Sequence, residues 1–366
     1  MGFSSLDCAR CAPDSRKRSV IYEMRVKASK GLERWFPILE VFMRMSRLNK
    51  SSCHGVLSAP RRLAPDCMVE GGLRSFRLPT AGSYPRQITL GSNGNMWFTE
   101  AAPGVSQIGM IDSQGRVAEF VVPTRFSAPS EIASGPDGAL WFTEPSGFPK
   151  GIGRVTTDGR FTEFGLVPVS SLTPNGIVVG PDGNLWFTEG NRNAIGKLEP
   201  SSGTFTFYKI PTPAATPEGI TIGPDDALWF AESQGNKIGR IDTMGNMTEF
   251  GPVMGPMKIA AGPDGNVWFT EPFNNKVGRI TPSGVITEFP LLTARAQPRD
   301  IVAGPDGNMW FTEYGAGLLA RITPNGSITE MEQIRGGLWG IGRGVGNTLW
   351  ITQMNENRLA RYTVAG

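Results

Sequence analysis

A ten-residue phrase that recurs seven times along the chain limits its possible folds more than any other feature. Five close copies occupy 135–144 (GPDGALWFTE), 180–189 (GPDGNLWFTE), 223–232 (GPDDALWFAE), 262–271 (GPDGNVWFTE) and 304–313 (GPDGNMWFTE). Looser copies occupy 91–100 (GSNGNMWFTE) and 344–353 (GVGNTLWITQ). Their tryptophans are separated by 44, 45, 43, 39, 42 and 40 residues. A period of about 42 residues is the length of one four-stranded blade of a β-propeller.

The segments inside each period read as short strands. The run PNGIVVG at 174–180 leads into an Asp-Gly pair, which supplies the positive φ of a tight hairpin, and NLWFTE follows as the second strand. In the next period, NKIGRI at 236–241 represents the third strand and NMTEF at 246–250 the fourth. These runs are rich in β-branched and aromatic residues and are closed by Gly or Pro, which excludes helical repeats of similar length. We therefore predict an all-β, seven-bladed propeller of four-stranded antiparallel blades.

The two ends of the repeat region predict how the ring closes. The last repeat stops at Gly366 without a fourth strand, whereas LRSFRLPT at 73–80 precedes the first repeat in the phase of that missing strand. An N-terminal strand that completes the last blade would remove an exposed sheet edge. This predicts one propeller domain over 71–366, preceded by a weakly ordered basic extension over 1–70. We expect the seven repeat tryptophans to pack in the core between blades.

Charge and cysteine placement limit the possible partners. Residues 1–70 hold 13 Lys/Arg against 7 Asp/Glu, and the rest of the chain holds 23 against 26, so the repeat region has no basic excess that would favour nucleic acid. All four cysteines and His54, the only histidine, precede the first repeat. The apolar patch at 34–45 is too short and interrupted to span a bilayer, and the lack of an export signal favours the cytoplasm. We expect a monomer.

Two series of residues are predicted to meet on one face of the ring. The start of the first strand and the end of the second lie at the same edge of an antiparallel hairpin. The innermost strand borders the channel, and its first positions differ from blade to blade, as at a ligand site on a repeated scaffold. This series consists of Arg86, Ser130, Asn175, Glu218, Met257, Arg299 and Trp339. The second series consists of Glu100, Glu144, Glu189, Glu232, Glu271, Glu313 and Gln353.

The glutamates allow two interpretations. Carboxylates suit magnesium or calcium, and Glu100 and Glu218 are the candidate metal ligands. The alternative is that they are structural carboxylates, either paired or bonded to the backbone, because five of them are followed, eight or ten residues later, by a cation on the adjoining strand. These cations are Arg154, Lys197, Arg240, Arg279 and Arg321.

The region from about Leu73 to Gly366, with GPDGNLWFTE, NKIGRI and TEFxIPTP in phase, resembles the virginiamycin B lyase (streptogramin B lyase) family. The resemblance implies a seven-bladed propeller that opens a cyclic depsipeptide antibiotic by elimination at its ester. Magnesium would polarise a carbonyl, and a base would remove the adjacent proton. The family has Pro-His at two late inner-strand starts, with two supporting glutamates. Here the matching phrases are QPRDI and GLWGI, so that Arg299, Trp339, Gly337 and Gln353 or Met354 stand at those four positions.

Two functional hypotheses remain open. Arginine and tryptophan accept no proton, so the family's base is missing. The favoured hypothesis is a noncatalytic module that binds a small molecule or peptide-like ligand at the channel mouth through Arg86, Asn175, Glu218, Arg299 and Trp339. The alternative is a magnesium-dependent carbon–oxygen lyase acting on streptogramin B-type depsipeptides or a related substrate, with Glu218 as catalytic base.

Overall fold

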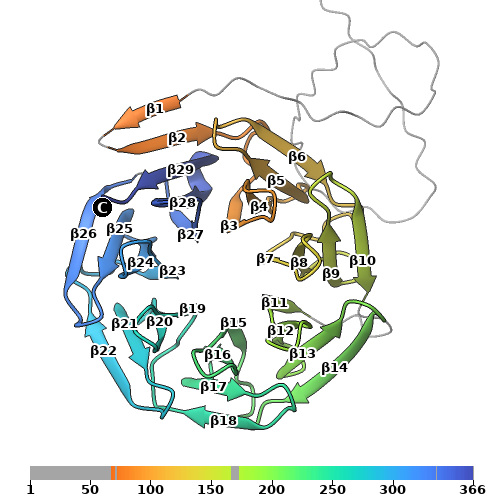
Figure 1. Cartoon of the computed structure of the whole chain (residues 1–366), viewed down its shortest axis with the longest axis vertical. Coiled ribbons are helices and arrows are strands. Elements are labelled where there is room, and N and C mark those ends of the chain that lie inside the picture. The colour runs from red at the N-terminus through yellow and green to blue at the C-terminus, as the bar shows by residue number, and fades with distance from the viewer. Residues whose placement is uncertain (1–66, 71, 166–172, 335, 366) are drawn as a thin grey trace, which may run out of the picture. The chain divides into compact units, whose positions relative to one another are not determined.

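Seven antiparallel sheets stand around a central channel in the part of the chain that the computed structural model describes (Figure 1). The described residues are 67–70, 72–165, 173–334 and 336–365, and they belong to one compact unit that spans Ser58–Gly366. The prediction of a seven-bladed, all-β propeller is confirmed. The expectations for residues 1–66, the apolar patch at 34–45 included, lie outside the described residues.

Each blade is a meander that runs from the channel to the rim. Blade 1 consists of β3 (Pro85–Leu90), β4 (Met96–Glu100), β5 (Gln107–Ile111) and β6 (Val117–Val121). Blade 2 consists of β7 (Ile132–Ser134), β8 (Leu140–Glu144), β9 (Gly151–Val155) and β10 (Phe161–Gly165). Blade 3 consists of β11 (Pro174–Val179), β12 (Leu185–Glu189), β13 (Ala194–Glu199) and β14 (Thr204–Lys209). Blade 4 consists of β15 (Pro217–Ile222), β16 (Leu228–Glu232), β17 (Lys237–Ile241) and β18 (Met247–Phe250).

The remaining blades repeat this order, and the first strand of every blade is innermost (Figure 1). Blade 5 consists of β19 (Ile259–Ala261), β20 (Val267–Glu271), β21 (Lys276–Ile280) and β22 (Ile286–Pro290). Blade 6 consists of β23 (Pro298–Ala303), β24 (Met309–Glu313), β25 (Leu318–Ile322) and β26 (Ile328–Gln333). Blade 7 takes β27 (Leu338–Arg343), β28 (Thr348–Gln353) and β29 (Arg358–Thr363) from the C-terminal end, with a 3-10 turn at Met354–Glu356.

The ring closes between segments that are far apart in the sequence. Strand β2 (Leu73–Arg77) pairs antiparallel with β29, with Leu73 opposite Tyr362 and Arg77 opposite Arg358. The predicted fourth strand of the last blade is therefore present. A further short strand, β1 (Cys67–Glu70), pairs with the outer side of β2 and gives this sheet five strands. The added strand covers the edge that β2 would otherwise expose.

The repeat tryptophans pack in the core, as predicted. All seven are at most 3% exposed. Trp186 belongs to one apolar cluster with Ile220, Leu228 and Phe230 of the following blade. Its indole Nε1 donates to Asp182 Oδ1 at 2.9 Å in its own turn. Burying such a ring removes roughly 150–250 Å² from water, which stabilises the fold by about 4–6 kcal/mol at most. Each phrase thus joins one blade to the next.

The turn within the phrase requires a left-handed residue. Gly183 has φ 74° in the copy GPDG, and Asp226 has φ 55° in the copy GPDD. Glycine adopts this conformation without steric cost, and aspartate is among the residues that tolerate it best. The hairpins are therefore tight, and this fixes the register of the first two strands. Among the described residues, no helix has the length and apolar character needed to cross a membrane.

Candidate functional site: the channel mouth

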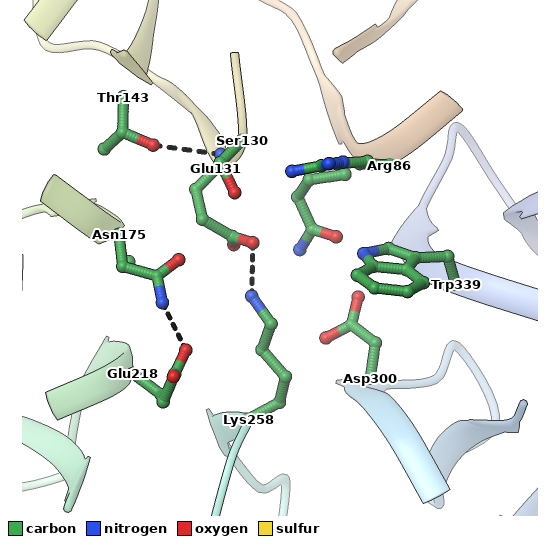
Figure 2. Close-up of polar contacts among 12 residues, drawn as sticks. Arg86, Ser130, Glu131, Thr143, Asn175, Glu218, Lys258, Asp300 and Trp339 are labelled. Atoms are coloured by element: carbon green, nitrogen blue, oxygen red, sulfur yellow. Dashed lines mark hydrogen bonds and ion pairs between the residues drawn. The ribbon is translucent and has the colours of Figure 1, made fainter. Parts of the chain in front are cut away.

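All seven residues of the first series line one cavity of about 270 Å³ at the mouth of the channel. They come from seven different blades and reach the cavity from the starts of the inner strands. Two further residues, Glu131 and Lys258, complete its lining. We call this cavity the mouth. Figure 2 shows several of these side chains converging on the channel axis.

In blades 1, 3, 4, 6 and 7 a bulge near the start of the inner strand sets two consecutive residues opposite one residue of the next strand. In blade 3, Pro174 pairs with Glu189 and Ile177 with Phe187, so that two residues face the single Thr188. The Thr188 hydroxyl accepts from the amide of Gly176 at 2.8 Å and donates to the carbonyl of Glu218, in the next blade, at 2.6 Å. Bulges of this kind redirect side chains at sheet edges. The backbone that carries the mouth residues is therefore fixed within and between blades.

Blade 4 tests this explanation within the same molecule. Its phrase has Ala231 where the other close copies have threonine. There the amide of Gly219 donates directly to the carbonyl of Met257 in blade 5 at 2.9 Å. Because a buried amide without an acceptor is costly, the backbone of the next blade supplies the acceptor that the hydroxyl would have provided.

The floor of the mouth is an ion pair that the sequence reasoning missed. Lys258 Nζ contacts Glu131 Oε1 from across the channel, and each side chain is 12% exposed (Figure 2). Below it lies a cavity of about 300 Å³ with an apolar wall. That wall has one isoleucine per blade: Ile88, Ile132, Ile177, Ile220, Ile259, Ile301 and Ile341.

The repeat did contain a signal for the floor. The position just before each isoleucine reads Gln, Glu, Gly, Gly, Lys, Asp and Gly around the ring, and therefore also varies from blade to blade, like the mouth position before it. Asp300 occupies this position in blade 6 and is 4% exposed. Its carboxylate accepts from the amides of Ile301 and Ile341, both at 2.9 Å. Burial raises the pKa of Asp300, while Lys258 and the two amides oppose that rise.

Two arginines flank one tryptophan on the blade 6, 7 and 1 side of the mouth. The Arg299 Cζ lies 3.6 Å from the ring centroid of Trp339, and the Arg86 Cζ lies 6.0 Å from it. The Nε atoms of both arginines are buried without a hydrogen-bond acceptor. Burial lowers the pKa of both guanidinium groups, partly offset by Glu131 for Arg86 and mainly by Glu218 for Arg299. A guanidinium stacked on an indole is held flat and leaves its edge available for a planar acceptor.

The opposite side of the mouth has a carboxylate, Glu218, and a side-chain amide, Asn175. Asn175 Nδ2 donates to Glu218 Oε2 between blades 3 and 4 (Figure 2). Burial raises the pKa of Glu218, whereas Lys258, Arg299 and the bond from Asn175 work against the rise. The mouth is therefore polarised, with two guanidinium groups whose Nε atoms lack an acceptor on one side and a hydrogen-bonded carboxylate on the other.

The second series lies inside the blades, not in the mouth. All six glutamates are at most 2% exposed, and Gln353 is 5% exposed. Burial, reinforced by a neighbouring outer-strand glutamate, raises the pKa of four of them to about 8. These four are Glu100, Glu144, Glu232 and Glu313.

The structural interpretation of these glutamates holds in part: Glu189 accepts from the amides of Thr173 and Arg192, and Glu271 from the amide of Met254. Their predicted pairing with strand cations is wrong. Strand pairing places each cation opposite the tryptophan, as for Trp229 and Arg240, so its side chain reaches the turn and not the far end of the strand. Arg240 Nε contacts Asp225 Oδ2 at 2.6 Å. The same partnership with the turn aspartate recurs in blades 2, 3, 5 and 6.

The structure does not bring the two candidate metal ligands together. Glu218 lines the mouth, whereas Glu100 lies within blade 1, where burial, reinforced by Glu119, raises its pKa. Over the described residues, no group of three or more His, Cys, Asp or Glu side chains is arranged to hold a metal ion.

The donors at the family's metal and base positions also do not fit magnesium. Arg299 is a cation and Trp339 only a donor, and Gly337 has no side chain. The Gln353 Oε1 already accepts from Ser75 Oγ at 3.0 Å. Magnesium is held by oxygen ligands, usually one or two carboxylates among them, so these four positions do not fit it.

Comparison with known proteins relates this geometry to one family. The model of the virginiamycin B lyase family matches residues 65–253, 149–337 and 251–366. A solved streptogramin B lyase structure is 36% identical, with 80% of this chain and 97% of that chain covered and a TM-score of 0.74. A catalytically inactive histidine-to-alanine variant of virginiamycin B lyase from Staphylococcus aureus, with quinupristin, is 37% identical, with coverage of 80% and 99% and a TM-score of 0.74.

A more distant likeness shows the fold alone. YCF48 bound to D1 peptide is 14% identical, with 82% of this chain and 98% of that chain covered and a TM-score of 0.63. No curated protein sequence matches the chain. The three family-model matches together span the whole propeller. The two lyase structures support the same family, because they share the fold and more than a third of the aligned residues. The chain therefore belongs to the virginiamycin B lyase family.

Proposed function

We propose that this protein is a noncatalytic propeller that binds a small molecule or peptide-like ligand at its channel mouth. The ligand-binding residues are Arg86, Asn175, Glu218, Arg299 and Trp339. One observation carries the proposal: the residues that differ from blade to blade at a single repeat position all line one cavity of about 270 Å³. A concave site with a few convergent polar groups on a rigid scaffold is the usual form of a ligand pocket.

The chemistry of the mouth favours binding over the family's elimination. The relative with quinupristin is catalytically inactive after a histidine-to-alanine change. In this chain the only histidine, His54, precedes the propeller, and Arg299 and Trp339 stand at the two positions where the resemblance implies histidine. Arginine remains protonated in proteins and tryptophan has no lone pair to accept a proton, so neither acts as a base near neutral pH.

A thermal-shift screen of a small-molecule and peptide collection tests the proposal. A ligand that binds only the folded state raises Tm by an amount that grows with the logarithm of its concentration relative to Kd. The mouth-filling variant Met257→Trp is compared with Met244→Trp, whose parent side chain is 84% exposed outside the mouth. We expect compounds that raise Tm of the wild type and of Met244→Trp but not of Met257→Trp. If every stabilising compound acts equally on all three proteins, the mouth is not the binding site.

A second candidate is a carbon–oxygen lyase in which Glu218 is the base. Burial raises the pKa of Glu218, and this is the direction that a carboxylate base needs near neutral pH. Elimination would break the ester C–O bond while the proton on the carbon beside the carbonyl moves to Glu218. Ring opening of a streptogramin B compound that is lost in Glu218→Gln supports this candidate against the first.

A further inference from the structure

A second cavity adjoins the mouth and shares Arg86 with it. It measures about 400 Å³ and is lined by the loops that connect strands at the mouth end of blades 1 and 2. Its lining includes Tyr84, Ala102, Val105 and Phe126, and we call it the blade 1–2 groove. Tyr84 is 43% exposed and Phe126 67% exposed. A hollow with exposed aromatic rings beside a charged pocket is a surface suited to an apolar ligand group.

Arg86 and Arg299 form no ion pair within 4.0 Å with any described residue. In the described residues, ion pairs within 4.0 Å occur ten times, at the blade turns, on the outer strands and at the floor of the mouth, and neither arginine takes part in any of them. Their Nε atoms are buried without an acceptor. Burial desolvates both guanidinium groups, so an anionic ligand that accepts from their outer nitrogens would offset part of that cost.

The neighbouring acids restrict the charge of that ligand. Glu131 is engaged with Lys258 and Glu218 with Asn175, but Glu218, Glu131 and Asp300 all act electrostatically on Arg299. A dianion such as a phosphate monoester would meet this negative potential at close range. A ligand group with a single delocalised negative charge would accept hydrogen bonds from the two guanidinium groups with less repulsion from these acids. A planar carboxylate has that charge, and it matches the bidentate edge of a guanidinium.

We propose that the mouth and the blade 1–2 groove together bind an organic carboxylate with an apolar tail. The carboxylate contacts Arg86 and Arg299 beside the ring of Trp339, and the tail lies in the groove against Val105 and Phe126. This inference rests on the proposed function and narrows it to one class of ligand. Arg86 joins the two parts because it lines both cavities.

Isothermal titration with simple probes tests the inference. The probes are octanoate, acetate, n-octylamine, 1-octanol and octyl phosphate, each titrated into the full chain at the same ionic strength. Octanoate is expected to bind at least about tenfold more tightly than each of the other four, because only octanoate offers both a monoanionic head and a tail. Stronger binding of octyl phosphate would overturn the choice of head group.

Variants separate the two halves of the site. Arg86→Gln and Arg299→Gln should each weaken octanoate binding by about tenfold or more. Arg299→Lys keeps the charge but loses the bidentate guanidinium edge, so its affinity for octanoate should lie between those of the wild type and Arg299→Gln. Phe126→Asn should weaken octanoate but not acetate, and asparagine tolerates the φ of 60° at this position. Arg160→Gln is the control, because that side chain is 84% exposed and lies outside both cavities. Octanoate binding that is equal in all these variants contradicts the inference.

The outcomes also separate this inference from the proposed function. If n-octylamine binds and Glu218→Gln abolishes its binding while octanoate does not bind, the mouth is a ligand site for cations, and the carboxylate inference is wrong. If no probe binds, the carboxylate inference is likewise wrong. The comparison of Met257→Trp with Met244→Trp then decides the proposed function by itself.

Discussion

The guanidinium of Arg299 stacks on the indole of Trp339, with 3.6 Å between the Arg299 Cζ and the ring centroid. The two residues start the inner strands of neighbouring blades 6 and 7, and they stand where the family resemblance implies histidines. A pair of proton acceptors is thereby replaced by a cation and the aromatic face that holds it. At the positions where the resemblance implies proton acceptors, the mouth of this chain therefore presents a cation stacked on an aromatic face.

Removing the aromatic face should weaken this arrangement measurably. Trp339→Leu loses the ring quadrupole, whereas Trp339→Phe keeps an aromatic face. We expect urea unfolding to show that Trp339→Leu lowers the free energy of unfolding by about 0.5–2 kcal/mol more than Trp339→Phe does. Ligand binding at the mouth should follow the same order. Equal unfolding curves for the two variants would mean that the stacking contributes nothing to stability.

Removing one partner of the ion pair at the floor should destabilise the fold more than removing both. Glu131 and Lys258 are each 12% exposed, so that removing one partner leaves the other charge almost desolvated. Lys258→Met is expected to lower the free energy of unfolding by about 3–5 kcal/mol, and the double variant with Glu131→Gln should recover most of that loss. Chemical unfolding of the two single variants and the double variant measures the coupling. Additive losses would contradict a direct pair.

The buried glutamates predict a stability that falls as pH rises. Burial and the nearby Glu330 raise the pKa of Glu313 to about 8, from an ordinary value of 4.5. Between those two values the unfolded chain has released this proton and the folded chain retains it, so the free energy of unfolding falls with rising pH over that window. Glu313→Gln should therefore raise stability at pH 8 by about 1 kcal/mol or more and change it little at pH 4.

The chain offers a natural precedent for this substitution. Blade 7 has Gln353 at the equivalent position, 5% exposed and bonded to Ser75. Thermal unfolding of wild type and Glu313→Gln at pH 4, 6 and 8 tests the prediction. A stability difference between the two proteins that is the same at all three pH values would show that Glu313 titrates normally.

The threonine hydroxyls between blades should contribute to the rigidity of the mouth. The Thr312 hydroxyl accepts from the amide of Asp300 at 3.1 Å and donates to the carbonyl of Trp339 at 3.2 Å. Thr312→Val keeps the shape and removes both bonds, which should lower the free energy of unfolding by about 1–3 kcal/mol. Thr248→Val, at an exposed position of β18, should change it by less than about 0.5 kcal/mol. Equal effects of the two changes would argue against the hydroxyl connection.

The repeat period allowed the fold and the outline of the mouth to be predicted, but not the pairing of charges. Arg86 and Arg299 could be placed because each follows a proline at the same point of the period. Glu131 and Lys258 were missed because simple alternation along a strand turns the next residue away. In blade 2, Ser130 and Glu131 both bond through their backbones to Thr143, and in blade 5 Met257 and Lys258 do the same with Thr270, so that both residues of each pair line the mouth. Arg240 was assigned to a glutamate by spacing, whereas strand register sets it opposite Trp229 and beside the turn.

The most direct test of the central claim is a turnover measurement. Purified protein is incubated with a streptogramin B compound and magnesium, and ring-opened product is followed by chromatography, since elimination leaves the mass unchanged. A mouth that binds without catalysis predicts no product above that formed with heat-denatured protein, in the wild type and in Glu218→Gln alike. Ring-opened product that forms with the wild type and disappears in Glu218→Gln would contradict the account.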